Sequence, residues 1–431
     1  MQYVSHFFTF NQPVQLFNLT LKNKLYLKNG RQIILNLCYF YRLQLLPPMR
    51  RIQILLLVLF GHTCIAQNMH ATRKILNTLS TPLFWGRGYT KGGMQKAAAF
   101  IEKEFTAAGL SPMGGKDFYQ QFSYPVNTFP GKMAVTINGK TLTPGKDFII
   151  DPVSISKHQT GIKEVKLDSN TFISREQRVI ITLQDKLTWG VAKKEENYTG
   201  INVRKDAVEG NPETADLDVE NLFIPEFKAA NICGIVKGTE KPDSLLLITA
   251  HYDHLGGMGA QTYFPGANDN ASGVTLLISL AKYYATHPQP YSIGFICFAG
   301  EEAGLLGSDY FTRHPLLPLN QIRFLINMDM VGTGEKGITV VNATLHPKEF
   351  ALLNTINNQK KYLSKINSRG KAANSDHYYF SEKGVPAFFI YTQGGPAAYH
   401  DINDLAKNLP LTRFRQLYRI IIKFNTALMQ P

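Results

Sequence analysis

Short apolar runs alternate with amphipathic segments over the second half of the chain. Five runs show little polar alternation, as expected for strands buried on both faces of a mostly parallel sheet; they span residues 245–249, 292–298, 324–327, 338–341 and 387–391. Apolar residues at helical spacing lie at 93–107, 272–284, 346–363 and 412–429. The pattern predicts an α/β fold, in which a three-layer, doubly wound, mostly parallel (mixed) sheet carries helices on both faces.

A β-rich module is predicted between residues 119 and 228. Short alternating runs in this span are separated by turn sequences such as Asn138-Gly139, a pair typical of β-hairpins. The charged stretch 193–219 is predicted to be a surface loop of the module. The module is then an insertion, and the flanking segments 67–118 and 229–431 are expected to form one α/β domain.

Charge is distributed unevenly along the chain. The 431 residues have a net charge of +14, but the first 66 carry seven basic residues and no acidic residue, which leaves +7 for the rest. The remaining surface is only mildly basic, so no nucleic-acid partner is expected. With 44% hydrophobic residues the chain is neither collagen-like nor disordered. Its four cysteines have no CxxC spacing, which gives no indication of a zinc knuckle or a redox pair.

A secretory signal peptide is predicted at residues 49–66. Met49 is followed by two arginines, an apolar run over 52–60 and small residues up to Ala66. The run is shorter than the roughly 20 residues that a transmembrane helix needs, so no stable membrane insertion is expected after signal removal. We therefore expect the mature protein to be periplasmic or secreted.

Two further expectations concern this N-terminal part. Residues 1–48 are rich in aromatic residues and lack acidic residues and clear periodicity, and we interpret them as an upstream extension from a wrongly assigned start codon. Lipoprotein anchoring on Cys64 is not expected, because Gly61-His62-Thr63 is a poor context for acylation.

Polar side chains of similar chemistry follow the predicted strands or lie in the loop beyond the last one. They are His251, Asp253, Asp269, Glu301, Glu302, Asp329 and His400. Each alone has an ordinary explanation: a pair of glutamates is favourable at a helix start, and an aspartate before a helix can cap it. Ligands of such sheets, however, bind beyond the carboxyl ends of the strands. Several carboxylates gathered there would repel one another, and a bound cation would relieve that repulsion.

The type of cation follows from the ligand atoms available. Imidazoles and carboxylates, with no thiolate nearby in sequence, suit zinc first and manganese or cobalt next. Two histidines and three carboxylates are too many for one catalytic tetrahedral zinc with an open position. They suit two zinc ions about 3.5–4 Å apart that share a bridging carboxylate.

Five sequence segments, in order along residues 231–404, carry a family resemblance. They read AHYDHLG, PGANDNASG, FAGEEAGLLGS, NMDMVG and AYHDINDL. Together they resemble the co-catalytic dizinc exopeptidases, which include bacterial leucyl aminopeptidases, glutamate carboxypeptidases and, as single-zinc relatives, glutaminyl cyclases. The segments 67–118 and 229–431 would then form the catalytic domain, with peptides as substrates.

The resemblance implies a role for each residue of the cluster. His251 and Asp329 would hold one zinc, Glu302 and His400 the other, and Asp269 would bridge both. The resemblance also implies that Glu301 is the general base and that Asp253 orients the imidazole of His251. The chain departs from the family pattern at Asn268, where an acidic residue is usual. That position is not a direct ligand in the family, so zinc binding is expected to persist.

Several functions remain compatible with these residues. The first hypothesis is a secreted or periplasmic aminopeptidase that hydrolyses N-terminal residues of peptides. A carboxypeptidase or dipeptidase would need a cationic pocket for the substrate carboxylate, for which Arg323 and Arg369 are the candidates. A glutaminyl cyclase is disfavoured by residues 270–273, which follow the peptidase pattern, and an inactive binding module by the retention of every candidate ligand. The module at 119–228 is expected to restrict access to the catalytic cleft.

Overall fold

The computed structural model describes residues 68–430 of the chain. The predicted upstream extension at 1–48 and the predicted signal peptide at 49–66 lie outside the described residues. Among the described residues, no helix combines the length and the apolar character needed to cross a membrane.

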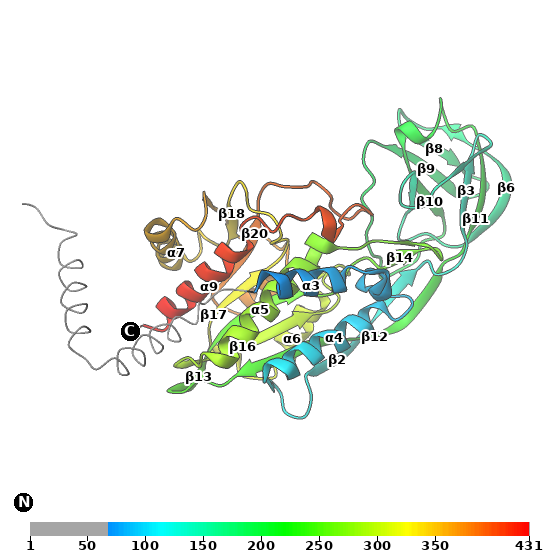
Figure 1. The fold of residues 1–431 in the computed structure, drawn as a ribbon. Helices are drawn as coiled ribbons and strands as arrows, with labels where there is room; N and C mark the ends of the chain where they lie inside the picture. The colour runs from blue at the N-terminus through cyan, green and yellow to red at the C-terminus, as the bar shows by residue number, and fades with distance from the viewer. Residues whose placement is uncertain (1–67, 431) are drawn as a thin grey trace, which may run out of the picture. The chain divides into compact units, whose positions relative to one another are not determined.

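A nine-stranded mixed sheet is the centre of the α/β part (Figure 1). Its strand order is β1-β12-β16-β13-β17-β20-β18-β19, and β2 also pairs with β12. The strands β16, β13, β17 and β20 are parallel to their neighbours in this group, whereas β12 and β18 pair antiparallel at its two sides. The bounds are β1 Ser111–Pro112, β2 Tyr119–Thr128, β12 Leu222–Val236, β13 Lys241–His251, β16 Tyr291–Phe298, β17 Ile322–Met328, β18 Ile338–Val341, β19 Ile366–Ser368 and β20 Ala387–Thr392.

Helices cover both faces of this sheet. On β13, Leu246 and Ile248 pack into the core that contains the apolar faces of α3, α4, α5 and α9, whereas Leu245 and Leu247 pack with Phe311 of α6 and others on the opposite side. Alternate side chains of one strand therefore enter two different layers, which confirms the predicted doubly covered α/β sheet. The helices are α3 Met69–Leu79, α4 Gly93–Ala108, α5 Gly273–Thr286, α6 Leu306–Arg313, α7 Pro347–Lys360, α8 His377–Glu382 and α9 Phe414–Leu428.

Two smaller sheets lie within the span of the predicted module. One contains β5 Phe148–Ile150, β10 Thr199–Arg204, β9 Val179–Gln184, β8 Thr171–Ser174 and β7 Val165–Lys166; the other contains β4 Lys140–Leu142, β3 Met133–Ile137, β11 Thr214–Val219 and β6 Lys157–Lys163. They enclose a core of their own. Asn138 and Gly139 join β3 to β4 with φ values of 50° and 76°, as expected for a tight hairpin turn. The predicted hairpin is confirmed.

The prediction of a surface loop over 193–219 was wrong. This stretch contains β10 and β11, on which Ile201, Val203, Leu217 and Val219 are buried in the core of the module. In β11 the charged residues Asp216 and Asp218 occupy the alternate, more exposed positions, whereas β10 carries Gly200, Asn202 and Arg204 at its alternate positions and is flanked by charged residues at 193–196 and 205–206. The charge of these residues masked the apolar half of the pattern.

The chain enters and leaves the module through the long strands β2 and β12. These two strands pair with each other from Tyr119 to Thr128, and β12 continues into the central sheet beside β16. A further short pair, β14 Gly257–Met258 and β15 Thr262–Tyr263, lies in the loop that follows β13. Single turns of 3-10 helix occur at Lys205–Ala207, Leu319–Gln321 and Ala406–Asn408, and a longer one at Pro82–Arg87.

Candidate metal centre

The candidate residues come from separate elements that end at the same edge of the central sheet. His251 is the last residue of β13, and Asp269 lies in the distorted turn Ala267–Ser272 before α5. Glu301 and Glu302 follow β16, and Asp329 follows β17. His400 lies in the loop after β20. The structure thus brings together the five candidate zinc ligands and Glu301.

One part of the cluster is centred on His251, whose side chain is 1% exposed. Its Nε2 atom lies 3.4 Å from Asp269 Oδ1 and 3.3 Å from Asp329 Oδ1. Glu301 Oε2 is farther from the same nitrogen, at 4.0 Å. The imidazole of His251 therefore lies close to two carboxylates and farther from a third.

A second part of the cluster is centred on His400. Its Nε2 atom lies 3.1 Å from Asp269 Oδ2 and 3.0 Å from Glu302 Oε2. Asp269 consequently presents one carboxylate oxygen to His251 and the other to His400. That arrangement places it between two sets, each with one imidazole and one further carboxylate.

Asp253 connects His251 to the two glutamates. The buried carboxylate of Asp253 accepts the backbone N–H of Glu301 at 3.1 Å and that of Glu302 at 3.3 Å. His251 Nδ1 lies 3.2 Å from the carbonyl oxygen of Asp253 and 3.7 Å from its carboxylate. A carbonyl only accepts, so Nδ1 carries the proton in the neutral imidazole and the lone pair is on Nε2, which faces the carboxylates.

Burial and charge shift the pKa values of the cluster in opposite directions. Burial, together with the neighbouring carboxylates, raises the pKa of Glu301 well above its usual range, although His251 opposes the shift. Burial also raises the pKa of Asp329. Burial would raise the pKa of Asp269 as well, but the nearby imidazoles of His251 and His400 hold it well below its usual range. Without a cation, the cluster thus holds more carboxylates than its imidazoles can neutralise.

The residues of the cluster fit a zinc ion because they offer suitable ligand atoms and because some of these atoms are buried without a hydrogen-bond partner. Within residues 68–430, the buried atoms His251 Nε2 and Asp329 Oδ1 have no hydrogen-bond partner. Ligand atoms of His251 with Glu301 and Asp329, and of His251 with Asp269 and Glu302, lie within 4.8 Å of one another. Imidazole nitrogen and carboxylate oxygen are common zinc ligands. Orphaned polar atoms of this kind, buried beside carboxylates, are what a cation would satisfy.

Three further residues support the cluster, and the sequence reasoning missed two of them, Asp404 and Arg87. His254 Nδ1 lies 2.7 Å from Glu302 Oε1, and the Asp404 carboxylate accepts the backbone N–H of Asn268 and of Asp269. Asp404 lies inside a family segment, but nothing there separated it from its neighbours. Arg87 is fully buried and donates only to backbone carbonyls, so no motif marked it.

Two other groups near the cluster are unassigned. The ring of Tyr399 stacks on that of His400 at 4.0 Å, while Tyr399 remains 42% exposed. Burial and the carboxylates of the cluster raise the pKa of the Tyr399 hydroxyl. The carboxylate of Asp376 is buried without a hydrogen-bond partner in residues 68–430, and burial raises its pKa to about 7.

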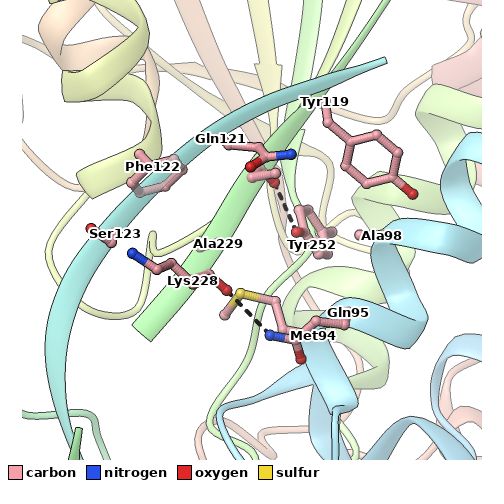
Figure 2. Close-up of a pocket in the computed structure, with 11 residues that line it drawn as sticks. Met94, Gln95, Ala98, Tyr119, Gln121, Phe122, Ser123, Lys228, Ala229 and Tyr252 are labelled. Atoms are coloured by element: carbon pink, nitrogen blue, oxygen red, sulfur yellow. Dashed lines mark hydrogen bonds between the residues drawn. The ribbon is translucent and has the colours of Figure 1, made fainter. Parts of the chain in front are cut away.

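A cavity of about 570 Å³ lies between α4, β2 and β12, with Tyr252 on its wall (Figure 2). The hydroxyl of Tyr252 donates to the carbonyl of Ala230, and Gln95 Nε2 donates to the carbonyl of Lys228. The residues that line this cavity include no carboxylate and no imidazole. The cavity therefore lacks the metal-binding side-chain types of the cluster described above.

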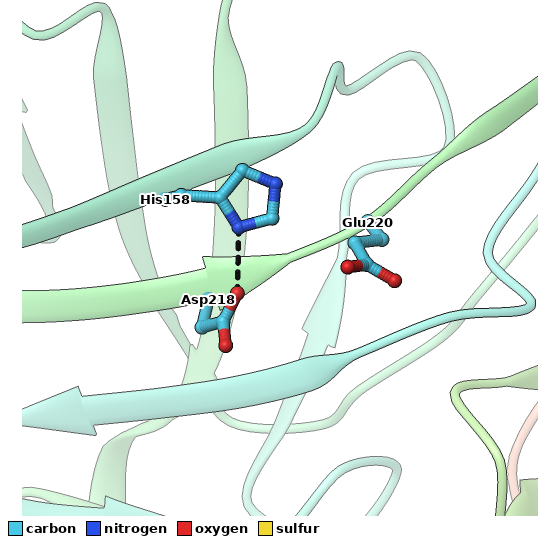
Figure 3. Close-up of side chains that lie close together, drawn as sticks. All are labelled: His158, Asp218 and Glu220. Atoms are coloured by element: carbon cyan, nitrogen blue, oxygen red, sulfur yellow. Dashed lines mark hydrogen bonds and ion pairs between the residues drawn. The ribbon is translucent and has the colours of Figure 1, made fainter.

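A second group of metal-binding side-chain types lies in the module. His158, Asp218 and Glu220 come together on β6 and at the end of β11 (Figure 3). His158 Nδ1 lies 2.6 Å from Asp218 Oδ1, and Lys132 Nζ pairs with the same carboxylate at 3.1 Å. Because His158 is exposed and Lys132 already supplies a positive charge, this group is satisfied as a surface ion pair.

Sequence comparison identifies a family and several relatives. Residues 231–425 match peptidase family M28. Aminopeptidase YwaD of Bacillus subtilis is 28% identical over 239 residues, which are 50% of this chain and 48% of that protein. A probable zinc metalloprotease of Pyricularia oryzae is 35% identical over 114 residues, 26% of this chain and 23% of that protein. The chain thus spans about half or less of the length of these curated relatives.

Solved structures with the same fold include three bacterial proteins. The zinc aminopeptidase BSAP from Bacillus subtilis has a TM-score of 0.63 at 18% identity, covering 83% of this chain and 94% of that chain. An aminopeptidase from Aneurinibacillus sp. strain AM-1 gives 0.60 at 17%, covering 85% and 95%. The peptidase M28 precursor from Shewanella amazonensis SB2B gives 0.61 at 16%, covering 85% and 98%. At these identities the likeness is one of fold.

Proposed function

Because residues 231–425 of this chain belong to peptidase family M28, we propose that the protein is a zinc-dependent aminopeptidase that removes N-terminal residues from peptides. The observation that carries the proposal is the position of Asp269, whose two oxygens face two different sets of imidazole and carboxylate. The name of the Bacillus subtilis relative supports an aminopeptidase, and that of the Pyricularia oryzae relative supports zinc.

The proposed centre holds two metal ions. His251 and Asp329 would hold one zinc, Glu302 and His400 the other, and Asp269 would be shared by both. When bound, zinc supplies a Lewis acid that polarises the scissile carbonyl. The excess of buried negative charge at the site supports the binding of more than one divalent cation.

Glu301 is proposed to move the proton. Its carboxylate lies beside the cluster but at 4.0 Å from His251 Nε2, farther than Asp269 and Asp329. From there it would take a proton from the attacking water and deliver it to the leaving amine, as a general base and then a general acid. Asp253 would hold Glu301 in place through the backbone N–H that it accepts.

A carboxypeptidase or dipeptidase on the same centre would require a cation for the substrate carboxylate. Arg323 lies near the start of β17, where its Nε donates to Ser244 Oγ at 3.2 Å. Asp329 follows the other end of that strand, so Arg323 gives this alternative no support. Arg369 contacts the hydroxyl of Tyr391 at 3.4 Å and is the remaining candidate.

The cellular location is also a proposal. The predicted signal peptide at 49–66 supports export, to the periplasm or outside the cell. We propose that the module at 119–228 narrows the approach of peptides to the centre, because it interrupts the catalytic part of the chain before β13.

The experiment that tests the function is hydrolysis of leucine p-nitroanilide and of its N-acetylated form. We expect rapid release of p-nitroaniline from the first substrate and none from the second, with activity lost on chelation and restored by zinc. A Glu301→Gln variant controls for contaminating peptidases. Faster hydrolysis of a peptide with a blocked N-terminus at its C-terminal bond would overturn the aminopeptidase and favour the carboxypeptidase.

A further inference from the structure

The loop that carries His400 is joined to the β-rich module by a reciprocal pair of contacts. The backbone N–H of Trp189 donates to the carbonyl of His400 at 3.0 Å, and His400 Nδ1 lies 2.9 Å from the carbonyl of Trp189. These residues are 211 positions apart in the sequence. A single module residue therefore fixes both the backbone and the side chain of a candidate zinc ligand.

The contact also selects the form of the imidazole. The carbonyl of Trp189 can only accept a hydrogen bond, so Nδ1 of His400 carries a proton. In the neutral ring the lone pair is then on Nε2, the atom that faces Asp269 and Glu302. Metal-binding histidines commonly use such a partner on the far nitrogen, which sets the tautomer and the direction of the ring.

Trp189 is held firmly by the core of the module. Its ring stacks on Phe264 with centroids 4.6 Å apart, and its Nε1 donates to the carbonyl of Ile150 at 2.8 Å. The side chain is buried. On the other side of the contact, His400 has a φ of 52°, a left-handed conformation that is unfavourable for a residue with a Cβ. The loop thus adopts a conformation that its neighbours must stabilise.

The module contacts the metal centre at a second place. Leu255, Met258 and Phe264, in the loop between β13 and Asp269, pack into the module core rather than the core of the central sheet. Met258 Sδ accepts the backbone N–H of Ile150 at 3.4 Å. The loops leading to Asp269 and carrying His400 therefore both rest on the same core.

We propose that Trp189 is a positioning residue for His400, so that the zinc set formed by Glu302 and His400 is completed by the module. This inference rests on the proposed function, because it assigns His400 to zinc. It gives the module a role in building the centre, in addition to any control of access. The zinc set of His251 and Asp329 comes from the ends of β13 and β17 and does not involve Trp189.

The test measures zinc affinity rather than activity. Purified protein is stripped of metal and titrated with zinc in competition with a chelator, for the wild type and Trp189→Ala. Trp189→Ala keeps the backbone groups that contact His400 but removes the side chain that anchors them. We expect one site of unchanged affinity and one weakened by up to about 10- to 100-fold, the usual effect of losing the outer partner of a metal ligand. Trp189→Phe keeps an aromatic ring against Phe264 and loses the Nε1 bond alone, so a smaller loss is expected.

Two controls separate positioning from general damage to the module. Phe172→Ala removes a buried aromatic side chain from β8 in the same core and should leave both zinc affinities unchanged. His400→Ala should weaken one site, and adding Trp189→Ala to it should cause no further loss, because Trp189 is proposed to act on zinc only through His400.

The outcomes distinguish this inference from the proposed function. Equal zinc affinities in Trp189→Ala and the wild type, or an equal loss in Phe172→Ala, would overturn the positioning role even if the wild type is an aminopeptidase. A wild type that binds two zinc ions but releases no p-nitroaniline would overturn the proposed function and leave the positioning role standing. Circular dichroism of each variant establishes that the compared proteins are folded.

Discussion

Arg87 and Asp269 are joined beneath the metal centre, where the guanidinium Nη2 donates to the carbonyl oxygen of Asp269 at 3.0 Å. The same buried guanidinium donates to four further carbonyls, those of Leu79, Tyr252, Pro265 and Gly266. Burial lowers the pKa of Arg87 to about 10, but the carboxylates of the cluster favour its charged form. One cation therefore ties the backbone next to His251 to the backbone of Asp269.

Replacing Arg87 should destabilise the whole chain. In Arg87→Lys a single ammonium replaces a planar group that bonds five carbonyl oxygens, so several of these would be left buried and unpaired. We expect a loss of about 3–5 kcal/mol in the free energy of unfolding. Urea denaturation of metal-free protein measures it. Arg313→Lys, whose side chain is largely exposed and pairs with Asp309, is the matched control and should change little. A loss below about 1 kcal/mol in Arg87→Lys would contradict this account.

Changing the adjacent residues Glu301 and Glu302 to glutamine should affect different properties, kcat in the first case and zinc binding in the second. Glu302 faces His400 at 3.0 Å, so Glu302→Gln should weaken one zinc site, with activity partly recovered in excess zinc. Glu301→Gln should keep both zinc ions and lose about 10²- to 10⁴-fold in kcat, the usual contribution of general-base catalysis. Zinc content and steady-state kinetics of both variants decide the matter. Loss of zinc from Glu301→Gln alone would reverse the two roles.

Removal of zinc should lower stability as well as activity. The cluster holds four carboxylates close to two imidazoles, and their repulsion is relieved when a cation binds. At free zinc about 100- to 1,000-fold above the dissociation constant, binding to the folded state stabilises it by about 3–4 kcal/mol. Thermal unfolding with and without chelator measures the difference. In the double variant Asp269→Asn, His400→Ala the melting temperature should respond little to zinc, and a full response there would contradict the assignment.

Sequence patterns were informative where local residue types decide the outcome. The apolar runs became β13, β16, β17, β18 and β20, because strands buried on both faces need apolar residues at nearly every position. The cluster residues were found for a similar reason, since each follows a strand directly or lies in a recognisable segment. The strands β10 and β11 were missed because charged residues flank β10 and occupy the alternate positions of β11.

The contacts of Arg87 and Trp189 could not be predicted in the same way. Arg87 bonds carbonyls up to 182 positions away, and Trp189 bonds the backbone of a residue 211 positions away. Every residue has a backbone carbonyl, so the acceptor leaves no mark in the sequence. Only the path of the chain in three dimensions brings these partners together. The contacts that support the centre therefore could not be predicted from the sequence, although the candidate ligands could.

The carboxylate of Glu164 should make stability depend on pH. Both of its oxygens are buried without a hydrogen-bond partner in residues 68–430, and burial raises the pKa of Glu164 from 4.5 to about 7. An acid with a raised pKa in the folded state costs nothing at low pH, where it is protonated in both states. As the pH rises from about 4.5 to about 7, the unfolded chain ionises more readily and stability is lost.

The Glu164→Gln variant removes this loss of stability. It should stabilise the protein by about 1 kcal/mol at pH 8 and have little effect at pH 4. The expected value at pH 8 is reduced because the side chain is only half-buried. Urea denaturation at both pH values tests it, with the exposed Glu176→Gln as the control that should show no such difference. An equal effect of Glu164→Gln at the two pH values would show that the carboxylate is hydrated in the folded protein.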